Sequence, residues 1–187
     1  MENLPSIETE RLILRPWRDS DFEPFAAMSA DTAVMEYFPS LLCATEVREM
    51  VDRIKNHFAA HGFGFWAVEE KSGADFIGLI GLAIPRFDAP FTPCVEIGWR
   101  LATEHWGKGY APEGARASLQ YAFEQLKLDE VVSFTSVLNL RSQRVMEKIG
   151  MTRSAADDFE HPMMPDGDRL RPHVLYRISR TDWRESS

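Results

Sequence analysis

The alternation of apolar and polar residues along the chain predicts a mixture of strands and helices. Short runs with two-residue periodicity or β-branched enrichment are typical of strands, and longer runs with apolar residues three and four apart are typical of helices. The predicted strands are 7–14, 64–70, 75–84, 95–101, 131–137, 152–159 and 171–179. The predicted helices are 19–30, a helix that follows Thr45, 113–127 and 139–149.

Turn and cap residues set the expected limits of these elements. Asp19 or Ser20 is predicted to cap the first helix, and Thr45 the second, because a short polar side chain accepts a hydrogen bond from the first turn. Gly62 and Gly64 are predicted to end the second helix. The strands on either side of 71–73 are predicted to form an antiparallel pair.

Length and composition indicate one domain covering 1–187, with a core of about 7–180. A net charge of −8 argues against nucleic-acid binding, which relies on basic surface. The first ten residues contain no apolar run, and no stretch is apolar enough to span a membrane, so a cytoplasmic location is expected. Cys43 and Cys94 have no spacing pattern and are expected to be reduced thiols.

The segment 106–111, Trp-Gly-Lys-Gly-Tyr-Ala, lies between a strand-like run and a helix-like run. Glycines at 107 and 109 permit backbone angles that other residues avoid, and Pro112 suits a first helical turn. The N–H groups at the start of a helix lack internal partners and favour a phosphate. The segment matches neither the nucleoside-triphosphate loop nor the dinucleotide fingerprint, so its glycines indicate either an anion site or an ordinary turn.

The order of strand, glycine loop, helix, strand and Asn-headed helix resembles the GNAT (N-acetyltransferase) superfamily over almost the whole chain. In the family's loop pattern, Trp106, Gly109 and Ala111 take the three characteristic places. The segments 8–17 and 173–177 look like the branch that includes the ribosomal-protein N-terminal acetyltransferases. The resemblance implies an α+β fold with a mixed, mostly antiparallel sheet of about seven strands, flanked by helices and splayed between the fourth and fifth strands.

Acetyl-CoA is the acyl donor that the resemblance implies. Loop amides would hold its pyrophosphate, and Lys108 would add charge there or remain a solvated turn lysine. Main-chain groups of 99–101 would pair with pantetheine, while Asn139 would face the cofactor, cap a helix, or do both. A backbone N–H near Ile97 or Gly98 would polarise the carbonyl if this glycine marks a bulge. The implied cofactor-binding residues are Trp99, Leu101, Trp106, Gly107, Lys108, Gly109, Tyr110, Ala111, Asn139 and Ser142.

The catalytic candidates are Glu96 and Ser142. Glu96 lies within a predicted core strand and would be either a general base or a salt-bridged carboxylate, with His105 as the second candidate base. Many relatives place a Tyr seven residues after the Asn, where this chain has Met146, which cannot donate a proton. Ser142 is the available hydroxyl and would orient or relay.

The acceptor is predicted to be a primary amine, either a protein N-terminal α-amine or a small-molecule amine, and an α-amine is easier to deprotonate than a lysine. The resemblance places 35–39 and the acidic 157–168 segment beside the acceptor, so the acceptor would be cationic unless those acids are a solvated face. The candidate acceptor-binding residues are Glu36, Tyr37, Phe38, Asp158 and Glu160, with Asp157, Asp166 and Asp168 in the same acidic cluster.

Two other functions stay open at this point: a non-catalytic acyl-CoA-binding domain, and a protein-interaction domain on the same fold. His57 and His61 lie four residues apart, but they lack a third ligand, so a solvated helix face is expected and no metal. The chain is expected to be a monomer or a homodimer.

Overall fold

The computed structural model describes residues 4–186 and shows an α+β arrangement of nine strands and five helices within them. Residues 1–3 and 187 of the predicted 1–187 domain lie outside the described residues. The strands are β1 (Ile7–Glu8), β2 (Leu12–Arg15), β3 (Phe65–Glu70), β4 (Gly78–Ala83), β5 (Glu96–Leu101), β6 (Glu130–Ser136), β7 (Thr152–Arg153), β8 (Phe159–Glu160) and β9 (Pro172–Ser179). The helices are α1 (Phe22–Ser29), α2 (Ala44–His61), α3 (Tyr110–Glu124), α4 (Leu140–Lys148) and α5 (Arg180–Ser186).

The strands form a sheet in the order β1-β2-β3-β4-β5-β6-β9-β7, and β8 also pairs with β9. Neighbouring strands are antiparallel except β5 and β6, which are parallel and have a single pair in register, Glu96 opposite Val132. By comparison, β4 and β5 share six pairs and β6 and β9 share seven. The sheet therefore opens between β5 and β6, which confirms the predicted mixed, mostly antiparallel sheet splayed between the fourth and fifth predicted strands.

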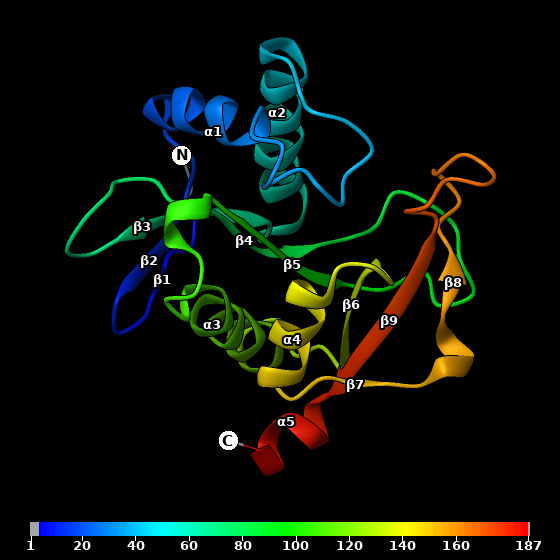
Figure 1. Cartoon of the computed structure of the whole chain (residues 1–187). Helices are drawn as coiled ribbons and strands as arrows, with labels where there is room; N and C mark the ends of the chain where they lie inside the picture. Colours follow the sequence, from blue (N-terminus) through cyan, green and yellow to red (C-terminus); the bar gives the residue numbers. More distant parts are fainter. Residues whose placement is uncertain (1–3, 187) are drawn as a thin grey trace.

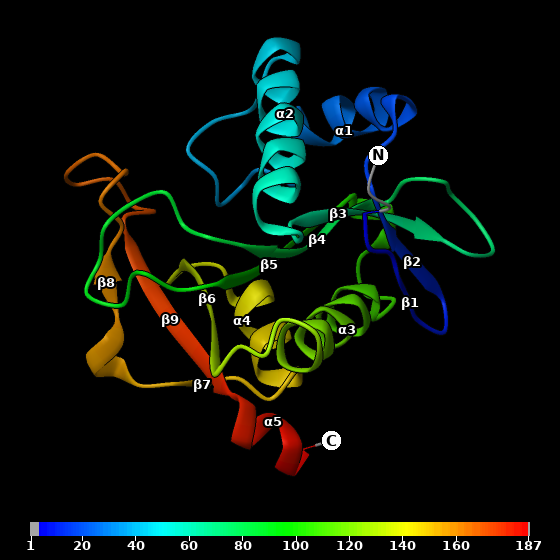
Figure 2. The same cartoon turned by 180° about the vertical axis from the view of Figure 1, so that it is seen from behind.

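Helices cover both faces of the sheet. Figures 1 and 2 show α1 and α2 on one face and α3 and α4 on the other. In α2, the buried residues Val47, Val51, Ile54 and Phe58 follow helical spacing, so one side of the helix packs on the core. Gly62 ends α2 in the left-handed conformation with φ of 76°, as predicted. Across residues 4–186, no helix combines the length and the apolar character needed to cross a bilayer.

Two predicted strands are each divided in the structure, so the sheet has nine strands rather than about seven. The segment 7–14 reverses direction at Thr9, whose N–H donates to the Leu12 carbonyl at 3.0 Å, and β1 then pairs with β2. The segment 152–159 is interrupted by a 3-10 turn, Ala155–Asp157, between β7 and β8. Two-residue periodicity continues through a short reversal, which is why it does not reveal these turns.

The predicted caps of the first two helices are wrong, and α3 begins earlier than expected. A 3-10 turn (Asp19–Asp21) precedes α1, and the carboxylate of Asp21, not of Asp19, accepts the Arg18 N–H at 2.7 Å. Cys43, not Thr45, is the N-cap of α2, and its N–H donates to the Glu46 carboxylate at 2.8 Å. In both cases the carboxylate belongs to the third residue of the first turn, Asp21 or Glu46, and accepts the N–H of the N-cap residue. The helical segment therefore begins at or before the polar residue that was predicted to cap it.

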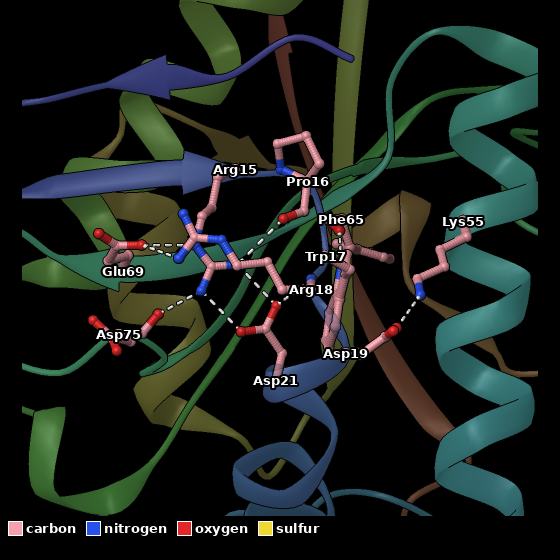
Figure 3. Close-up of polar contacts among 10 residues, drawn as sticks. All are labelled: Arg15, Pro16, Trp17, Arg18, Asp19, Asp21, Lys55, Phe65, Glu69 and Asp75. Atoms are coloured by element: carbon pink, nitrogen blue, oxygen red, sulfur yellow. Dashed lines mark hydrogen bonds and ion pairs between the residues drawn. The ribbon is translucent and has the colours of Figure 1, made fainter. Parts of the chain in front are cut away.

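A buried arginine joins β2 to β3 and to the turn before α1 (Figure 3). The Arg15 guanidinium binds both carboxylate oxygens of Asp21 at 2.8 Å, the carboxylate of Glu69 at 2.7 Å and the carbonyl of Asp75 at 2.6 Å. Arg15 and Asp21 are 3% and 1% exposed, so this charge pair lies in the interior. A buried ion pair is tolerated when its hydrogen-bonding groups have partners, and this fold provides them.

Candidate active site

A cleft of about 830 Å³ follows the opening between β5 and β6. It is bounded by the two strands, the loop before α3, the start of α4 and the segment that precedes α2. Most of the predicted site residues lie along it: Tyr37, Phe38, Glu96, Trp99, Leu101, Trp106, Gly107, Gly109, Tyr110, Ala111, Asn139 and Ser142. The lining does not include Glu36, Lys108, Asp158 or Glu160.

The glycine loop has the backbone conformation that its sequence predicts. Gly107 and Gly109 have φ of 73° and 83°, in the left-handed region, and Gly109 is the N-cap of α3 without any side-chain cap. The Glu113 N–H donates to the Gly109 carbonyl at 3.2 Å, so the N–H groups of Tyr110 and Ala111 come before the first intrahelical donor and have no acceptor within the helix. Together with the helix dipole, these amides make the loop suited to a pyrophosphate.

Side-chain contacts from the turn between β1 and β2 and from β3 hold this loop in place. Arg11 donates to the Glu113 carboxylate at 2.7 Å and to the Lys108 carbonyl at 2.9 Å, while Thr9 donates to Glu113 at 2.6 Å. The Tyr110 hydroxyl donates to Glu70, and the Tyr110 side chain is buried. Sequence reasoning missed this role of Thr9 and Arg11, because their partners lie about 100 positions later in the chain.

The main chain of β5 beyond the opening is the predicted partner of pantetheine. Ala102 N–H donates to the Ile77 carbonyl of the preceding segment, so by antiparallel alternation Gly98 and Arg100 face β4, whereas Trp99 and Leu101 face the opening. The Leu101 carbonyl accepts the Trp106 indole N–H at 2.7 Å. The main chain of Trp99 therefore faces the cleft with no strand opposite it.

Gly98 does not mark a bulge in the β4–β5 pairing, so the condition for a polarising amide near Ile97 or Gly98 is not met in that pairing. The register runs without a break from Gly78 opposite Leu101 to Ala83 opposite Glu96. A Cβ at Gly98 would lie 3.2 Å from the Phe65 ring, so the glycine is explained by close packing. Because Ile97 adjoins the β5–β6 pair and the Gly98 N–H faces β4, Trp99 carries the better-placed amide for a carbonyl oxygen.

Glu96 lies where β5 and β6 part and has no ion-pair partner among the described residues. Burial raises its pKa to about 8, so it gains and loses a proton near neutral pH, as a general base requires. This geometry favours the general-base hypothesis over the salt-bridged alternative. His105 is buried, and its Nδ1 lies 3.5 Å from the Glu70 carboxylate without a hydrogen bond.

Cys94 is not a suitable nucleophile. Burial and the nearby carboxylate of Glu96 raise the pKa of its thiol to about 11, so it stays protonated at neutral pH. A thiolate is needed for an acyl-enzyme, so the site favours direct attack by the acceptor.

Asn139 is the N-cap of α4, as predicted. Its Oδ1 accepts the Ser142 N–H at 3.1 Å, and its Nδ2 donates to Thr135 Oγ1 at 3.1 Å. Ser142 and Met146 both line the cleft, with Met146 where a tyrosine is frequent, so Ser142 is the hydroxyl at this helix face.

Replacing Asn139 with alanine is expected to lower the free energy of unfolding by about 1 kcal/mol, because the first turn of α4 loses its cap. Urea denaturation measures this directly. Asn139→Ser restores a capping oxygen and should recover most of the loss; equal loss in both variants would contradict the cap's contribution.

The acidic residues predicted to face the acceptor are neutralised by arginines instead. Glu36 pairs with Arg141 at 2.5 Å, and Asp158 pairs with Arg153. Arg171 pairs with both Glu160 and Asp166, and Arg177 pairs with Asp157. The five carboxylates lie outside the cleft lining, although Arg141 is part of it, so a cationic acceptor stays a prediction from the sequence.

The two histidines of α2 differ: His61 is exposed, as the predicted solvated face requires, whereas His57 packs against the following segment. His57 is half-buried, its Nδ1 lies 2.8 Å from the Phe63 carbonyl, and its Nε2 accepts the Ile84 N–H at 3.1 Å. Within residues 4–186, no group of three or more His, Cys, Asp or Glu side chains is placed to hold a metal.

Two features of the cleft were not predicted. One is Arg100 on β5. The sequence did contain a signal for it, because Arg100 is a second charged residue in the strand that holds Glu96. The other is an aromatic wall with ring contacts from Phe134 of β6 to His173 of β9 and His161 after β8. Burial and the neighbouring His173 lower the pKa of His161 to about 4, so this wall is uncharged at neutral pH.

A family model, the Acetyltransferase (GNAT) domain, matches residues 11–152, which include the cleft's loop, β5, β6 and α4. The chain therefore belongs to the GNAT family of acetyltransferases and is an N-acetyltransferase.

Particular relatives extend this match along the chain. It is 31% identical to the FsC-acetyl coenzyme A-N(2)-transacetylase of Aspergillus fumigatus over 186 residues, covering 96% of this chain and 78% of that protein. A crystal structure of a GNAT-family acetyltransferase from Bacillus anthracis has a TM-score of 0.78 and 28% identity, covering 95% of this chain and 99% of that one. Spermidine N-acetyltransferase from Vibrio cholerae, in complex with CoA and spermine, shares the fold with a TM-score of 0.73 and 21% identity, covering 94% of this chain and 99% of that one.

Proposed function

We propose that the chain transfers the acetyl group of acetyl-CoA to a primary amine by direct attack in a ternary complex. The observation that carries the proposal is that three features line one cleft: the left-handed glycines before α3, the unpaired main chain of Trp99 and the carboxylate of Glu96. The Aspergillus relative is named as an acetyl coenzyme A-N(2)-transacetylase, which supports the same donor.

Each residue has a defined task in this proposal. Loop amides hold the pyrophosphate, and the Trp99 N–H polarises the thioester carbonyl. Glu96 accepts the proton that the amine loses as the new C–N bond forms and the C–S bond breaks. The thiolate of CoA is the leaving group, with the Ser142 hydroxyl near its path. Lys108 is exposed and contributes charge at the loop edge.

The whole chain is proposed to act as one domain. Its cytoplasmic location, its state as monomer or homodimer and its placement in the ribosomal-protein branch stay predictions from the sequence.

Calorimetric titration with acetyl-CoA, followed by a thiol-release assay with a panel of primary amines, tests the proposal. Micromolar binding and amine-dependent thiol release are expected. A folded protein that binds acetyl-CoA but acetylates no amine would favour the non-catalytic acyl-CoA-binding alternative for this chain, and absence of binding would overturn the assignment of the cleft.

A further inference from the structure

Arg100 brings a positive charge to the cleft without a counter-ion. Its Nε and Nη1 are buried and have no hydrogen-bond partner in the described part of the chain. The guanidinium lies 4.0 Å from the centre of the Phe38 ring, and no carboxylate of residues 4–186 is within ion-pair distance. Most buried polar groups in proteins have partners, so this side chain requires an explanation.

Arg15 shows what the same fold does with a structural arginine. Both charged residues are on strands, but Arg15 has carboxylates on two sides and a carbonyl on a third (Figure 3). Arg100 has only an aromatic face, which compensates part of the loss of water. Burial lowers the pKa of Arg100 to about 10, so it is still charged at neutral pH. A charge kept here without a partner suggests that the partner is a ligand.

The position of Arg100 separates it from the expected site of the pyrophosphate. Along β5, Trp99 lies opposite Ile80, whose side chain reaches the α3 residue Gly114. Arg100 points to the other face of the sheet, where Phe38 precedes α2. Glu96 shares that face, four residues away and about 13 Å along the strand at roughly 3.3 Å per residue. An acceptor between them would meet a base at one end and a cation at the other.

We propose that Arg100 binds an oxyanion, a carboxylate or a phosphate ester, carried by the acceptor amine. The inference rests on the proposed acetyl transfer and deepens it, because it names the acceptor class. The Arg100 guanidinium lies over the Phe38 ring, and its fork of N–H groups matches the paired oxygens of a carboxylate or a phosphate ester. Among residues 4–186, Glu96 is the carboxylate that lines the cleft, and the arginine-paired Glu160 lies outside the lining.

The test is a thiol-release assay on matched sets of primary amines that differ only in one substituent: carboxylate, phosphate ester or neutral carboxamide. Wild-type protein is expected to prefer an anionic acceptor over its carboxamide by at least 10-fold in kcat/KM, mainly through KM. Whichever of the carboxylate and phosphate-ester amines has the higher kcat/KM identifies the oxyanion that Arg100 binds. Arg100→Gln should erase the preference while leaving the Kd for acetyl-CoA unchanged, and Arg100→Lys should restore part of it.

Stability separates a ligand-binding arginine from a structural one. Arg100→Gln removes an unpaired buried charge and is expected to keep or raise the Tm. Arg15→Gln is the matched control: it leaves the buried Asp21 without its ion-pair partner and should lower the Tm by several degrees. Loss of folding in Arg100→Gln to the same extent as in Arg15→Gln would overturn the inference.

Turnover data can overturn it as well. The inference fails if wild-type protein binds acetyl-CoA and acetylates carboxamides as well as anionic amines, or if Arg100→Gln slows every acceptor equally. Failure of the proposed function is recognised separately, by the absence of acetyl-CoA binding in calorimetry or by the absence of thiol release with every amine, anionic or neutral.

Discussion

Gly109→Glu is expected to weaken acetyl-CoA binding at least 100-fold, a loss of about 2.7 kcal/mol of binding free energy. Gly109 is the N-cap of α3 with φ of 83°, and the N–H groups that follow it have no acceptor within the helix. A glutamate here places a negative charge where the pyrophosphate would bind and reverses the favourable field of the helix N-terminus. Calorimetric titration of wild type and variant measures the effect.

Backbone strain is the competing cause of such a loss, and the chain offers a matched control. Gly167, between β8 and β9, has φ of 79° and open space where a Cβ would lie, and it does not line the cleft. Gly167→Glu should therefore lose a similar free energy of unfolding, about 1 kcal/mol, yet keep the wild-type Kd. Unchanged binding in Gly109→Glu, or equal weakening in both variants, would rule out the loop as the pyrophosphate site.

The glycine loop and the order of elements could be predicted because each depends on local chemistry, whereas the opening of the sheet was implied by the resemblance to the GNAT superfamily. A left-handed backbone favours glycine wherever it occurs, as at Gly107 and Gly109. An amphipathic run such as α2 carries its buried face in its own spacing. The errors at 7–14 and 152–159 arose where a short reversal left the two-residue pattern intact.

The charged residues of the site could not be predicted in the same way, because the partner of a charge is set by tertiary structure. Arg15 and Arg100 both interrupt apolar strands, but one meets Asp21 and Glu69 and the other meets Phe38. Likewise, nothing near Glu160 indicates that Arg171 neutralises it. An acidic segment therefore suggested a cationic acceptor, whereas the folded chain presents an unpaired arginine.

Glu96→Gln is expected to lower kcat at least 100-fold with any accepted amine, within the usual range for loss of a general base. With a pKa of about 8, wild-type Glu96 is only about one-tenth ionised at pH 7, so kcat should rise about tenfold per pH unit and level off above pH 8. The variant should lose this rise. The measurement uses kcat at saturating acceptor, because free amines titrate in the same range. Glu130→Gln, which alters an exposed carboxylate on β6, is the control and should change kcat less than about twofold.

The same substitution should make the protein more stable in base, which the loss of a salt-bridged glutamate would not do. Because its folded-state pKa lies above the usual value of 4.5, Glu96 keeps its proton on folding, and wild-type stability falls as pH rises from about 4.5 to 8. Each pKa unit corresponds to about 1.4 kcal/mol, and water in the cleft reduces the total, so a gain of about 2 kcal/mol for Glu96→Gln is expected at pH 9 relative to pH 5. Urea denaturation at the two pH values tests this. A variant that is less stable than wild type at pH 9 would show that the carboxylate has a hidden partner, and a variant with full kcat would remove Glu96 from the mechanism.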